Sequence, residues 1–583
     1  MIASTEAFRF AAVAWLRELQ AATDRRTSAR LSGALVVAAV AAIPAAFYVG
    51  GLGFYLDDHY FLGIMSTSRD QSVPGLFDAL ARDDPKAWLR PGMYLGLTVL
   101  FRLFGTNPLP YHLFVAALVP ACAVLLYVIL DRLHAPRFLA VGVPIVFAAA
   151  PHYSTDRFWL ASYAAPASVV LALAGVYALL RACGADGWRL AGWLVGGGGA
   201  IVLSVLFYEV VVPLLIVVVI GLWYRRRSGS GNAFITAVSA SLSLAGVLVY
   251  KGIATSTLAG GSSHQLGYQT GFAHHIGYLV SGSVKVNFGT YGLGLPYVVG
   301  WIFTHRPTWT AAAASLLVGL VVLAYLTRSG RQLELPARLR AGRRIWLLLV
   351  AAGLALIVIG YASFLVTGDI YFTSAGIDNR VNIVAAMGVA LLAIGLVLRA
   401  AQWLSARRQA AGFAVGVALL AATGTLITNT LADYWTAAST RQREVVARLS
   451  DALPMKLSRA TVVLDGVCPE IGPGVVFAAP YDLAGTLRAR YHDPSIQAPV
   501  ATAAVAAESR GLVISTLLFG KKGPHFYPYR PRLLVYDWPR GSTIRLRDAA
   551  AARQYLATTP RLSCPPLRSF TWGIHTSRFV PFA

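Results

Sequence analysis

Long apolar stretches separated by short basic loops are the feature that most constrains this chain. A helix that crosses a bilayer needs about 20 mainly apolar residues. With 56% hydrophobic and only 13% charged residues, the chain could not cover these stretches in water, and the sequence predicts a polytopic α-helical membrane protein. About eleven segments are candidate spans: 31–50, 111–130, 138–151, 162–181, 189–207, 210–224, 233–252, 309–327, 345–366, 383–399 and 411–430.

The same composition excludes other classes of protein. The formal net charge of +24 would by itself suggest a nucleic-acid binder, but soluble nucleic-acid-binding proteins and disordered chains are not this apolar. Four Cys among 583 residues exclude both a disulfide-dense scaffold and a Cys-rich metal protein.

Arginines in the short loops predict the orientation of the chain. Cytoplasmic loops carry the excess of Lys and Arg, and the basic groups of this chain fall on one side of the predicted spans. Eleven spans then place the N-terminus in the cytoplasm and the C-terminus outside. Because Ala and Arg richness fits a bacterium with a GC-rich genome, we expect the bacterial inner membrane. The basic groups are Arg9, Arg17, Arg25, Arg26, Arg30, Arg132, Arg137, Arg181, Arg189, Arg225, Arg226, Arg227, the six Arg in 328–344, Arg399, Arg407 and Arg408.

The chain is predicted to divide into a transmembrane domain, residues 1–430, and an extracytoplasmic α/β domain, residues 431–583. The second part lacks an apolar span and alternates strand-like with helix-like runs behind an amphipathic helix at 431–452. Two more stretches, 51–110 and 253–308, are also too long to be simple outer connectors. The expected elements of the tail are strands at 461–464, 475–478, 511–518 and 532–536 and helices at 482–490 and 548–557.

Two of the four cysteines, Cys468 and Cys564, lie in this tail. An oxidising outer compartment permits a disulfide between them. The alternative is two separate buried thiols.

The strongest local signal for chemistry is the acidic pair Asp57-Asp58, directly after the first span. Desolvation at the membrane surface and a neighbouring like charge both raise a carboxylate pKa, which suits a general base that works near neutral pH. The structural alternative is a helix N-cap, a position that Asp favours. Together with His59 the pair could also bind a metal, although ligands so spaced are weak evidence.

Further motifs follow the acidic pair in a characteristic order, and this order resembles the GT-C superfamily of membrane glycosyltransferases. The likeness includes protein O-mannosyltransferases, bacterial lipid A aminoarabinose transferases and tetratricopeptide-linked O-mannosyltransferases, and it covers about residues 31–230. The motifs are Leu89-Arg90-Pro91, Leu103-Phe104-Gly105, Asn107-Pro108, Tyr111-His112, Pro151-His152-Tyr153 with Asp156 and Trp159 behind it, and Tyr208-Glu209.

The resemblance implies a lipid-linked sugar donor and a role for each acid. Asp57 matches the first acid of the pair, the expected base for the acceptor hydroxyl, and Asp58 matches the second acid, which helps to orient it. The run after them, His59-Tyr60-Phe61, differs from the Asp-Glu-x-His-Phe pattern of some protein mannosyltransferases, so the acceptor class stays open.

A polyprenyl-phosphate leaving group would need cationic partners at the outer surface. The alternative for each cation is a snorkelling anchor or a solvated loop residue. Glu209 is an acid flanked by apolar sequence, which marks a functional candidate; its alternative is a carboxylate at a wet hairpin turn, paired to a nearby Arg. The predicted donor-phosphate or substrate-binding residues are Arg90, His152, Asp156, Glu209, Lys251, Lys285 and Arg380, and Arg157, His264, His274 and His275 are further outer-side candidates.

The sequence therefore predicts an inverting glycosyltransferase that moves a sugar from a polyprenyl-phosphate donor to an extracytoplasmic glycan, lipid or protein. Its partners would be the donor, the acceptor and membrane lipids, with no nucleic acid; a divalent metal is left open and no other cofactor is expected. One rival is a lipid or glycan transporter or flippase, which explains the spans but not the outer domain or the acidic pair. The other is a non-catalytic envelope scaffold.

Overall fold

The computed structural model describes residues 28, 30–226, 231–258, 272–304, 308–329, 345–366, 372–454, 457–501, 504–515, 524–560 and 564. Several residues used in the sequence analysis lie outside this part of the chain. They are Arg9, Arg17, Arg25, Arg26, Arg227, His264 and the arginines between 330 and 344.

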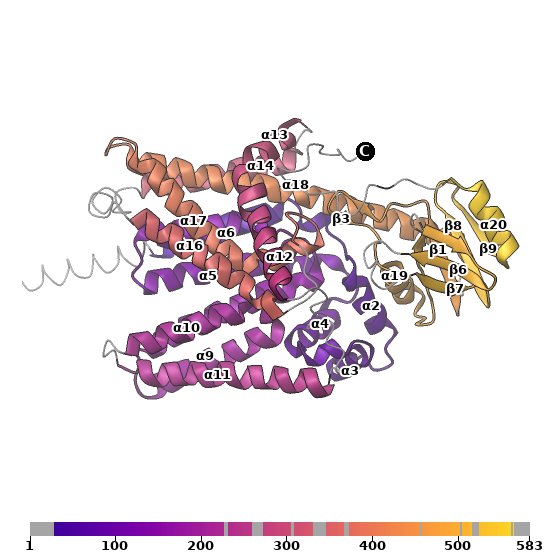
Figure 1. Cartoon of the computed structure of the whole chain (residues 1–583), viewed down its shortest axis with the longest axis horizontal. Helices are drawn as coiled ribbons and strands as arrows, with labels where there is room; N and C mark the ends of the chain where they lie inside the picture. The colour runs from indigo at the N-terminus through magenta and orange to yellow at the C-terminus, as the bar shows by residue number, and fades with distance from the viewer. Residues whose placement is uncertain are drawn as a thin grey trace, which may run out of the picture.

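A helical bundle forms the larger part of the molecule, and its helices run side by side (Figure 1). Among the described residues, nine helices are long and apolar enough to cross a membrane, by length and composition. The fold is thus that of a polytopic α-helical membrane protein with a strand-containing C-terminal domain. The nine are a first span at Arg30–Gly51, α5 (Pro108–Arg132), α8 (Ala164–Ala182), α9 (Gly187–Phe207), α11 (Ala233–Ile253), α14 (Trp309–Arg328), α16 (Ile345–Ala362), α17 (Ile383–Gln402) and α18 (Gln409–Ala452).

The two other expected spans are shorter helices. α6 (Arg137–Ala149) has 13 residues, and α10 (Val212–Arg226) has 15. Every residue of α6 from Phe138 to Ala149 is buried, which is typical of a helix enclosed by its neighbours and not of one that faces lipid. It packs against α5, α17 and α18.

The long stretch after the first span contains three α-helices. α2 (Asp57–Thr67) follows the first span, and α3 (Val73–Asp83) packs with α4 (Pro91–Phe104). α3 is amphipathic: the hydroxyl of Ser72 accepts a hydrogen bond from the Gly75 amide at its N-terminus, and Leu76 and Leu80 lie buried on one face. The polar residues of α3 therefore lie on its exposed face.

The described part of the stretch 253–308 contains two π-helical segments. η6 (Ala254–Leu258) extends α11, and η7 (Lys285–Leu293) lies between α12 (Phe272–Val284) and α13 (Leu295–Thr304). π-helical turns are rare and frequently lie at functional sites.

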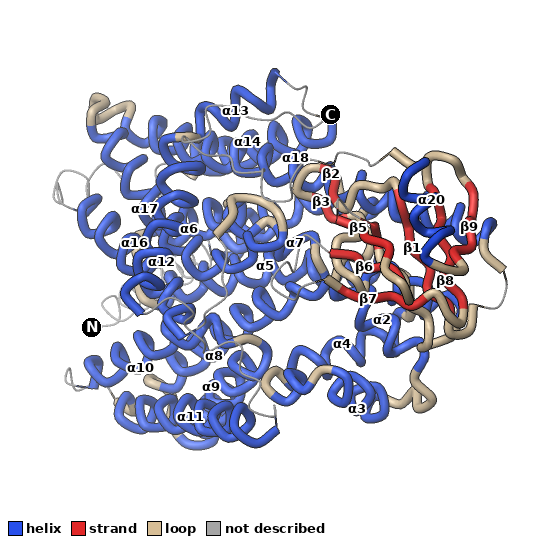
Figure 2. The backbone as a smooth tube through the Cα atoms, turned by 45° about the vertical axis from the view of Figure 1, so that its right-hand side comes forward, coloured by secondary structure: helices blue, strands red, loops and turns tan. Residues whose placement is uncertain are grey.

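The C-terminal domain holds all the strands of the described chain, at one end of the molecule (Figure 2). One sheet has the order β4-β1-β8-β9, in which β1 is parallel to β4 and β8, and β9 is antiparallel to β8. A hairpin, β2-β3, and a three-stranded antiparallel sheet, β5-β6-β7, complete it. The strands are β1 (Ala460–Asp465), β2 (Glu470–Ile471), β3 (Gly474–Val475), β4 (Val500–Ala501), β5 (Ala504–Ala507), β6 (Gly511–Ser515), β7 (His525–Pro528), β8 (Arg532–Asp537) and β9 (Ser542–Leu546), and the helices are α19 (Asp482–Tyr491) and α20 (Ala549–Thr558).

The structure agrees with most predicted elements of the tail and changes two of them; residues 516–518 of the strand expected at 511–518 lie outside the described residues. The expected last span, 411–430, and the expected amphipathic helix, 431–452, form one continuous helix, α18, of 44 residues. The strand expected at 475–478 is limited to Gly474–Val475. The predicted disulfide between Cys468 and Cys564 is confirmed, with Cα atoms 5.6 Å apart.

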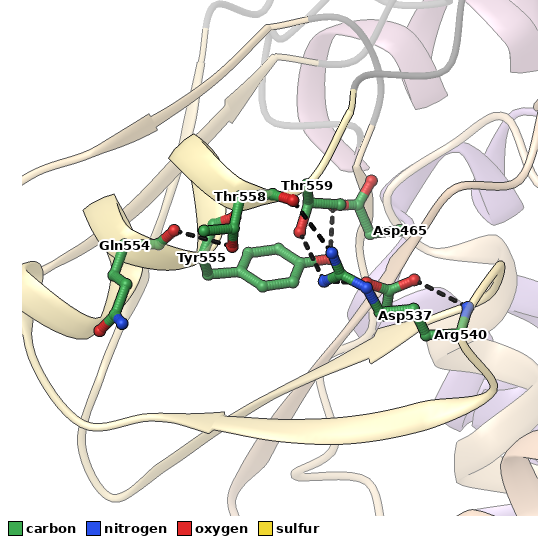
Figure 3. Close-up of polar contacts among 7 residues, drawn as sticks. All are labelled: Asp465, Asp537, Arg540, Gln554, Tyr555, Thr558 and Thr559. Carbon is green, nitrogen blue, oxygen red and sulfur yellow. Dashed lines mark hydrogen bonds and ion pairs between the residues drawn. The ribbon is translucent and has the colours of Figure 1, made fainter.

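A polar cluster fastens α20 to the carboxyl end of the parallel strands (Figure 3). Asp465 and Asp537 end β1 and β8 side by side. The Tyr555 hydroxyl donates to Asp465 Oδ2 at 2.9 Å, and Arg540 Nη1 donates to Asp537 Oδ2 at 3.1 Å. Arg540 Nη2 also donates to the carbonyl of Thr558 at 2.9 Å. These polar groups bind one another, so the cluster has a structural role.

Candidate active site

The acidic pair stands at a sharp turn between the first span and α2. Leu56 adopts φ 48°, ψ −118°, a conformation that is rare for a residue with a side chain, and it redirects the chain so that α2 begins at Asp57. Asp58 holds this turn: its Oδ2 accepts a hydrogen bond from the Tyr55 amide at 2.9 Å, and its Oδ1 accepts one from the Ala161 amide at 2.7 Å. Backbone strain of this kind is maintained only where the surroundings fix it.

Aromatic side chains also hold the turn in place. The Tyr55 hydroxyl donates to the carbonyl of Trp435 in α18 at 2.8 Å. Trp159 Nε1 in turn donates to the carbonyl of Tyr55 at 2.9 Å. Two segments distant in sequence, residues 159–161 and α18, therefore fix the start of α2, and with it the position of both carboxylates.

Asp57 and Asp58 have different surroundings. Asp58 is 1% exposed, and each of its carboxylate oxygens accepts a hydrogen bond from a backbone amide. These contacts give Asp58 a structural role. Asp57 is only half-buried, and its Oδ1 accepts a hydrogen bond from the hydroxyl of Tyr481 at 2.7 Å. Burial raises the pKa of Asp57, while the Tyr481 hydrogen bond and the charge of Arg380 partly oppose that shift. A carboxylate in this state suits a general base.

Arg380 is the cation that acts most strongly on Asp57. It lies on the short helix η9 (Ile377–Asn382), with its guanidinium 4.8 Å from the centre of the Trp159 ring. Asn379 Oδ1, also on η9, accepts a hydrogen bond from the Ser154 hydroxyl at 3.1 Å. The loop before α8 and the N-terminal side of α17 are therefore joined beside the acidic pair.

Asp156 and His152 lie in the same joined region and are deeply buried. One oxygen of Asp156, Oδ1, accepts a hydrogen bond from the Ser162 hydroxyl, and the other, Oδ2, has no partner in the described chain. Burial raises the pKa of Asp156 well above its ordinary value, although Ser162 and Arg380 oppose this. His152 packs on Tyr291, at 4.6 Å between ring centres, and burial lowers its pKa to about 3, so it is a neutral imidazole.

Arg90, Glu209 and Lys251 form an ion cluster. Arg90 Nη2 is 2.5 Å from Glu209 Oε1, and Lys251 Nζ is 3.1 Å from Glu209 Oε2. The Arg90 guanidinium also lies 4.4 Å from the centre of the Tyr208 ring. Burial opposes ionisation of Glu209, but its two cationic neighbours outweigh this and lower its pKa below the ordinary value. The cluster carries one net positive charge.

Tyr94 and Asp84 connect this cluster to Asp57. The Tyr94 hydroxyl donates to Asp84 Oδ2 at 2.6 Å, and Tyr94 lies within electrostatic range of both Arg90 and Asp57. Asp84 and Lys86 act in turn on Asp57. Arg380 thus acts on Asp57 directly, whereas Arg90 and Lys251 are linked to it only through Tyr94 and Asp84.

The remaining candidates lie elsewhere. Lys285 is exposed at the start of η7. Arg157 is buried and donates to the carbonyls that end α6, at Ala148 and Ala150, which is a helix-capping role. His274 is exposed, and the ring of His275 bonds the carbonyl of Phe364 at 2.9 Å. Within the described residues, no group of three His, Cys, Asp or Glu side chains could hold a metal ion.

Sequence reasoning missed Tyr481, Asp84 and Tyr94. Asp84 and Tyr94 sit in the same outer stretch as the acidic pair, where Asp84 could have been noticed as a further acid near the membrane surface. Tyr481 is separated from Asp57 by 424 residues and carries no motif. Only the docking of the C-terminal domain brings it to the site.

Comparisons with known proteins give one distant likeness. No protein-family model matches the sequence, and no curated protein sequence matches it significantly. Among solved structures, the chain is similar to the crystal structure of ArnT from Cupriavidus metallidurans bound to undecaprenyl phosphate. The TM-score is 0.40 at 11% identity, over 94% of this chain and 96% of that chain. This likeness is too distant to assign a family or a substrate to this chain.

Proposed function

We propose that this protein is a membrane glycosyltransferase that moves a sugar from a polyprenyl-phosphate donor to a hydroxyl of an extracytoplasmic acceptor. The observation that carries the proposal is the setting of Asp57. It is a half-buried carboxylate with a raised pKa, it follows the first span, and the cations Arg380 and Lys86 act on it. The order of sequence motifs that resembles GT-C enzymes also supports the proposal.

The chemistry is a single displacement at the anomeric carbon of the sugar. Asp57 takes the proton of the acceptor hydroxyl, the acceptor oxygen bonds to the anomeric carbon, and the bond from that carbon to the phosphate oxygen breaks with inversion. The products are the glycosylated acceptor and the polyprenyl phosphate, and the proton on Asp57 is later released to water. The base needs its carboxylate form, so the reaction requires a pH above the pKa of Asp57.

Cationic side chains would hold the departing phosphate. Arg90 and Lys251 converge on Glu209 from two different helical segments, and their cluster keeps one positive charge in excess. Arg380, over Trp159, acts on Asp57 directly. Guanidinium groups bind phosphate oxygens in a bidentate manner, and fixed positive charge stabilises a developing oxyanion in a site of low dielectric.

The test is sugar transfer by purified protein in detergent, with a radiolabelled polyprenyl-phosphate sugar and a membrane extract as acceptor. The Asp57→Asn variant keeps the size of the side chain but cannot take a proton, and we expect transfer to fall by at least about 100-fold. Asp78→Asn is the matched control, because Asp78 is an exposed acid of the same outer stretch, paired with Arg82. Equal transfer by the Asp57→Asn variant and the wild type would refute the proposed mechanism.

The same preparation separates the rival functions. Movement of the labelled lipid across vesicles, equal in wild type and the Asp57→Asn variant and without transfer, would favour a flippase. No binding of the donor would favour a scaffold. We also propose that residues 431–583 are extracytoplasmic; a reporter that is active only in the cytoplasm should be inactive when fused at Ala583.

A further inference from the structure

The C-terminal domain docks directly on the helix that begins with the acidic pair. α19 and α2 lie side by side between the bundle and the sheet (Figure 1). Their approach is so close that a Cβ atom built at Gly485 would lie 2.1 Å from the carbonyl oxygen of His59. A Cβ atom at Gly63 would lie 2.8 Å from the Cα atom of Gly485. Only glycine at these two positions permits this contact.

Side-chain hydrogen bonds fix the docked position. His59 is 8% exposed; its Nδ1 is 2.9 Å from the Thr486 hydroxyl of α19, and its Nε2 is 3.3 Å from Gln442 Nε2 of α18. The Gln442 amide also donates to the carbonyl of Val476 at 2.6 Å. A residue next to the acidic pair is therefore bound by both the C-terminal domain and the long helix that carries it.

The position of Tyr481 within this interface is equally well defined. Asp482 Oδ2 accepts hydrogen bonds from the amides of Ala478 and Ala479, at 2.8 and 2.9 Å, which fixes the turn that precedes α19. The Tyr481 ring packs against the Tyr60 ring of α2, with 5.3 Å between centres. These contacts direct the phenol hydroxyl to Asp57 Oδ1.

We infer that Tyr481 is a positioning residue of the reaction, so that the C-terminal domain completes the active site of the transmembrane domain. The inference rests on the proposed function, because it assigns Tyr481 to the base Asp57. A hydrogen bond at Oδ1 holds the carboxylate in one orientation and leaves Oδ2 for the acceptor proton. A carboxylate already fixed in this way loses no further orientational freedom when the acceptor binds.

The test is the Tyr481→Phe variant, which removes one oxygen and keeps the ring on Tyr60. Tyr491→Phe is the control, because Tyr491 is a tyrosine at the far end of α19, the helix that Tyr481 precedes. We expect kcat to fall by about 10-fold with the donor KM unchanged, since a misoriented base slows only the chemical step. We also expect the acidic limb of the pH–rate profile to move to higher pH. The Tyr481 hydrogen bond lowers the pKa of Asp57, so its loss raises that pKa.

Several results would overturn the inference. An unchanged kcat with an unchanged pH profile would reduce Tyr481 to an interface residue. A raised kcat would show that its hydroxyl occupies the place of the acceptor and inhibits the enzyme. A fall in kcat without a change in the pH profile, accompanied by a lower melting temperature, would indicate a purely structural role.

A double-mutant cycle on melting temperature separates this inference from the proposed function, because it needs no activity. The Asp57→Asn and Tyr481→Phe variants are compared with the double variant. We expect the double variant to lose less than the sum of the two single losses, since Tyr481→Phe removes the donor of a hydrogen bond that Asp57→Asn has already weakened by removing the charge of its acceptor. If the wild type transfers sugar and the losses add, only the role of Tyr481 is refuted; if the wild type transfers no sugar, the proposed function fails whatever the cycle gives.

Discussion

The contact between α2 and α19 makes a prediction that can be worked from the structure, with Gly485→Ala as the perturbation. Real Cβ atoms are essentially never found within 3.0 Å of another heavy atom, and the new one would lie 2.1 Å from the carbonyl oxygen of His59. The helices must therefore separate by about 0.9 Å. That movement would stretch the Tyr481–Asp57 and Thr486–His59 hydrogen bonds, now 2.7 and 2.9 Å, beyond the range in which such bonds are effective.

The expected loss of stability follows from three terms. Overpacking costs about 1–3 kcal/mol, and a lost hydrogen bond to a charged group costs about 1.5–3 kcal/mol. Alanine in a helix gains about 1 kcal/mol over glycine, which offsets part of this. We therefore expect Gly485→Ala to destabilise the docked domain by roughly 1.5–5 kcal/mol and to lower sugar transfer with it.

The assay is thermal unfolding in detergent, together with limited proteolysis between the two domains. Gly192→Ala is the matched control: Gly192 is also helical, and nothing lies within 4 Å of a Cβ atom built there. The control should keep or slightly raise the melting temperature. If Gly485→Ala unfolds at the temperature of the control and resists the protease equally, the close docking of α19 on α2 is refuted.

Three further variants test the ion cluster, the disulfide and a buried acid. Glu209→Gln should lower the free energy of unfolding by about 1–2 kcal/mol in thermal unfolding. This loss is smaller than for a fully buried ion pair, because the three side chains are 15–35% exposed. An unchanged stability would show that the two ion pairs make no net contribution. Cys468→Ser opens a loop with a sequence separation of 96 and should lower stability by about 2–4 kcal/mol in urea unfolding, as should a reductant on the wild type. Burial raises the pKa of Asp482 to about 8, so the folded state favours the protonated form and stability falls as pH rises from about 4 to 8. The melting temperature of the Asp482→Asn variant should therefore depend less on pH over this range than that of the wild type. An equal dependence would contradict the raised pKa.

The helical bundle could be predicted from the sequence because the signal for a span is local. Twenty apolar residues in a row identify a span whatever surrounds them. The end of the last membrane helix was harder to predict, since the apolar part of α18 ends near residue 430 while the helix itself continues to Ala452. Loss of apolar character ends a span without ending a helix. α6 was expected as a full span, but its length is set by its place inside the bundle.

The candidate site was predictable only where its residues carry a local sequence signal. Asp57 was found because acids are scarce in this chain and a pair directly after a span is conspicuous. The pairing of Glu209 with Arg90 and Lys251 joins residues that were each identified alone, and it also agrees with the structural alternative of a carboxylate paired to an Arg. The different settings of Asp57 and Asp58 depend on contacts between distant segments, which a local pattern does not carry.

The helix α18 runs without a break from the helical bundle to the C-terminal domain. At 1.5 Å per residue its 44 residues span about 66 Å, more than twice the hydrocarbon thickness of about 30 Å. Each degree of tilt at the membrane moves the far end by about 1 Å. Helices tilt to match bilayer thickness. Because Gln442 of α18 contacts His59 next to the acidic pair, we expect a change in the tilt of α18 to alter the geometry of the site.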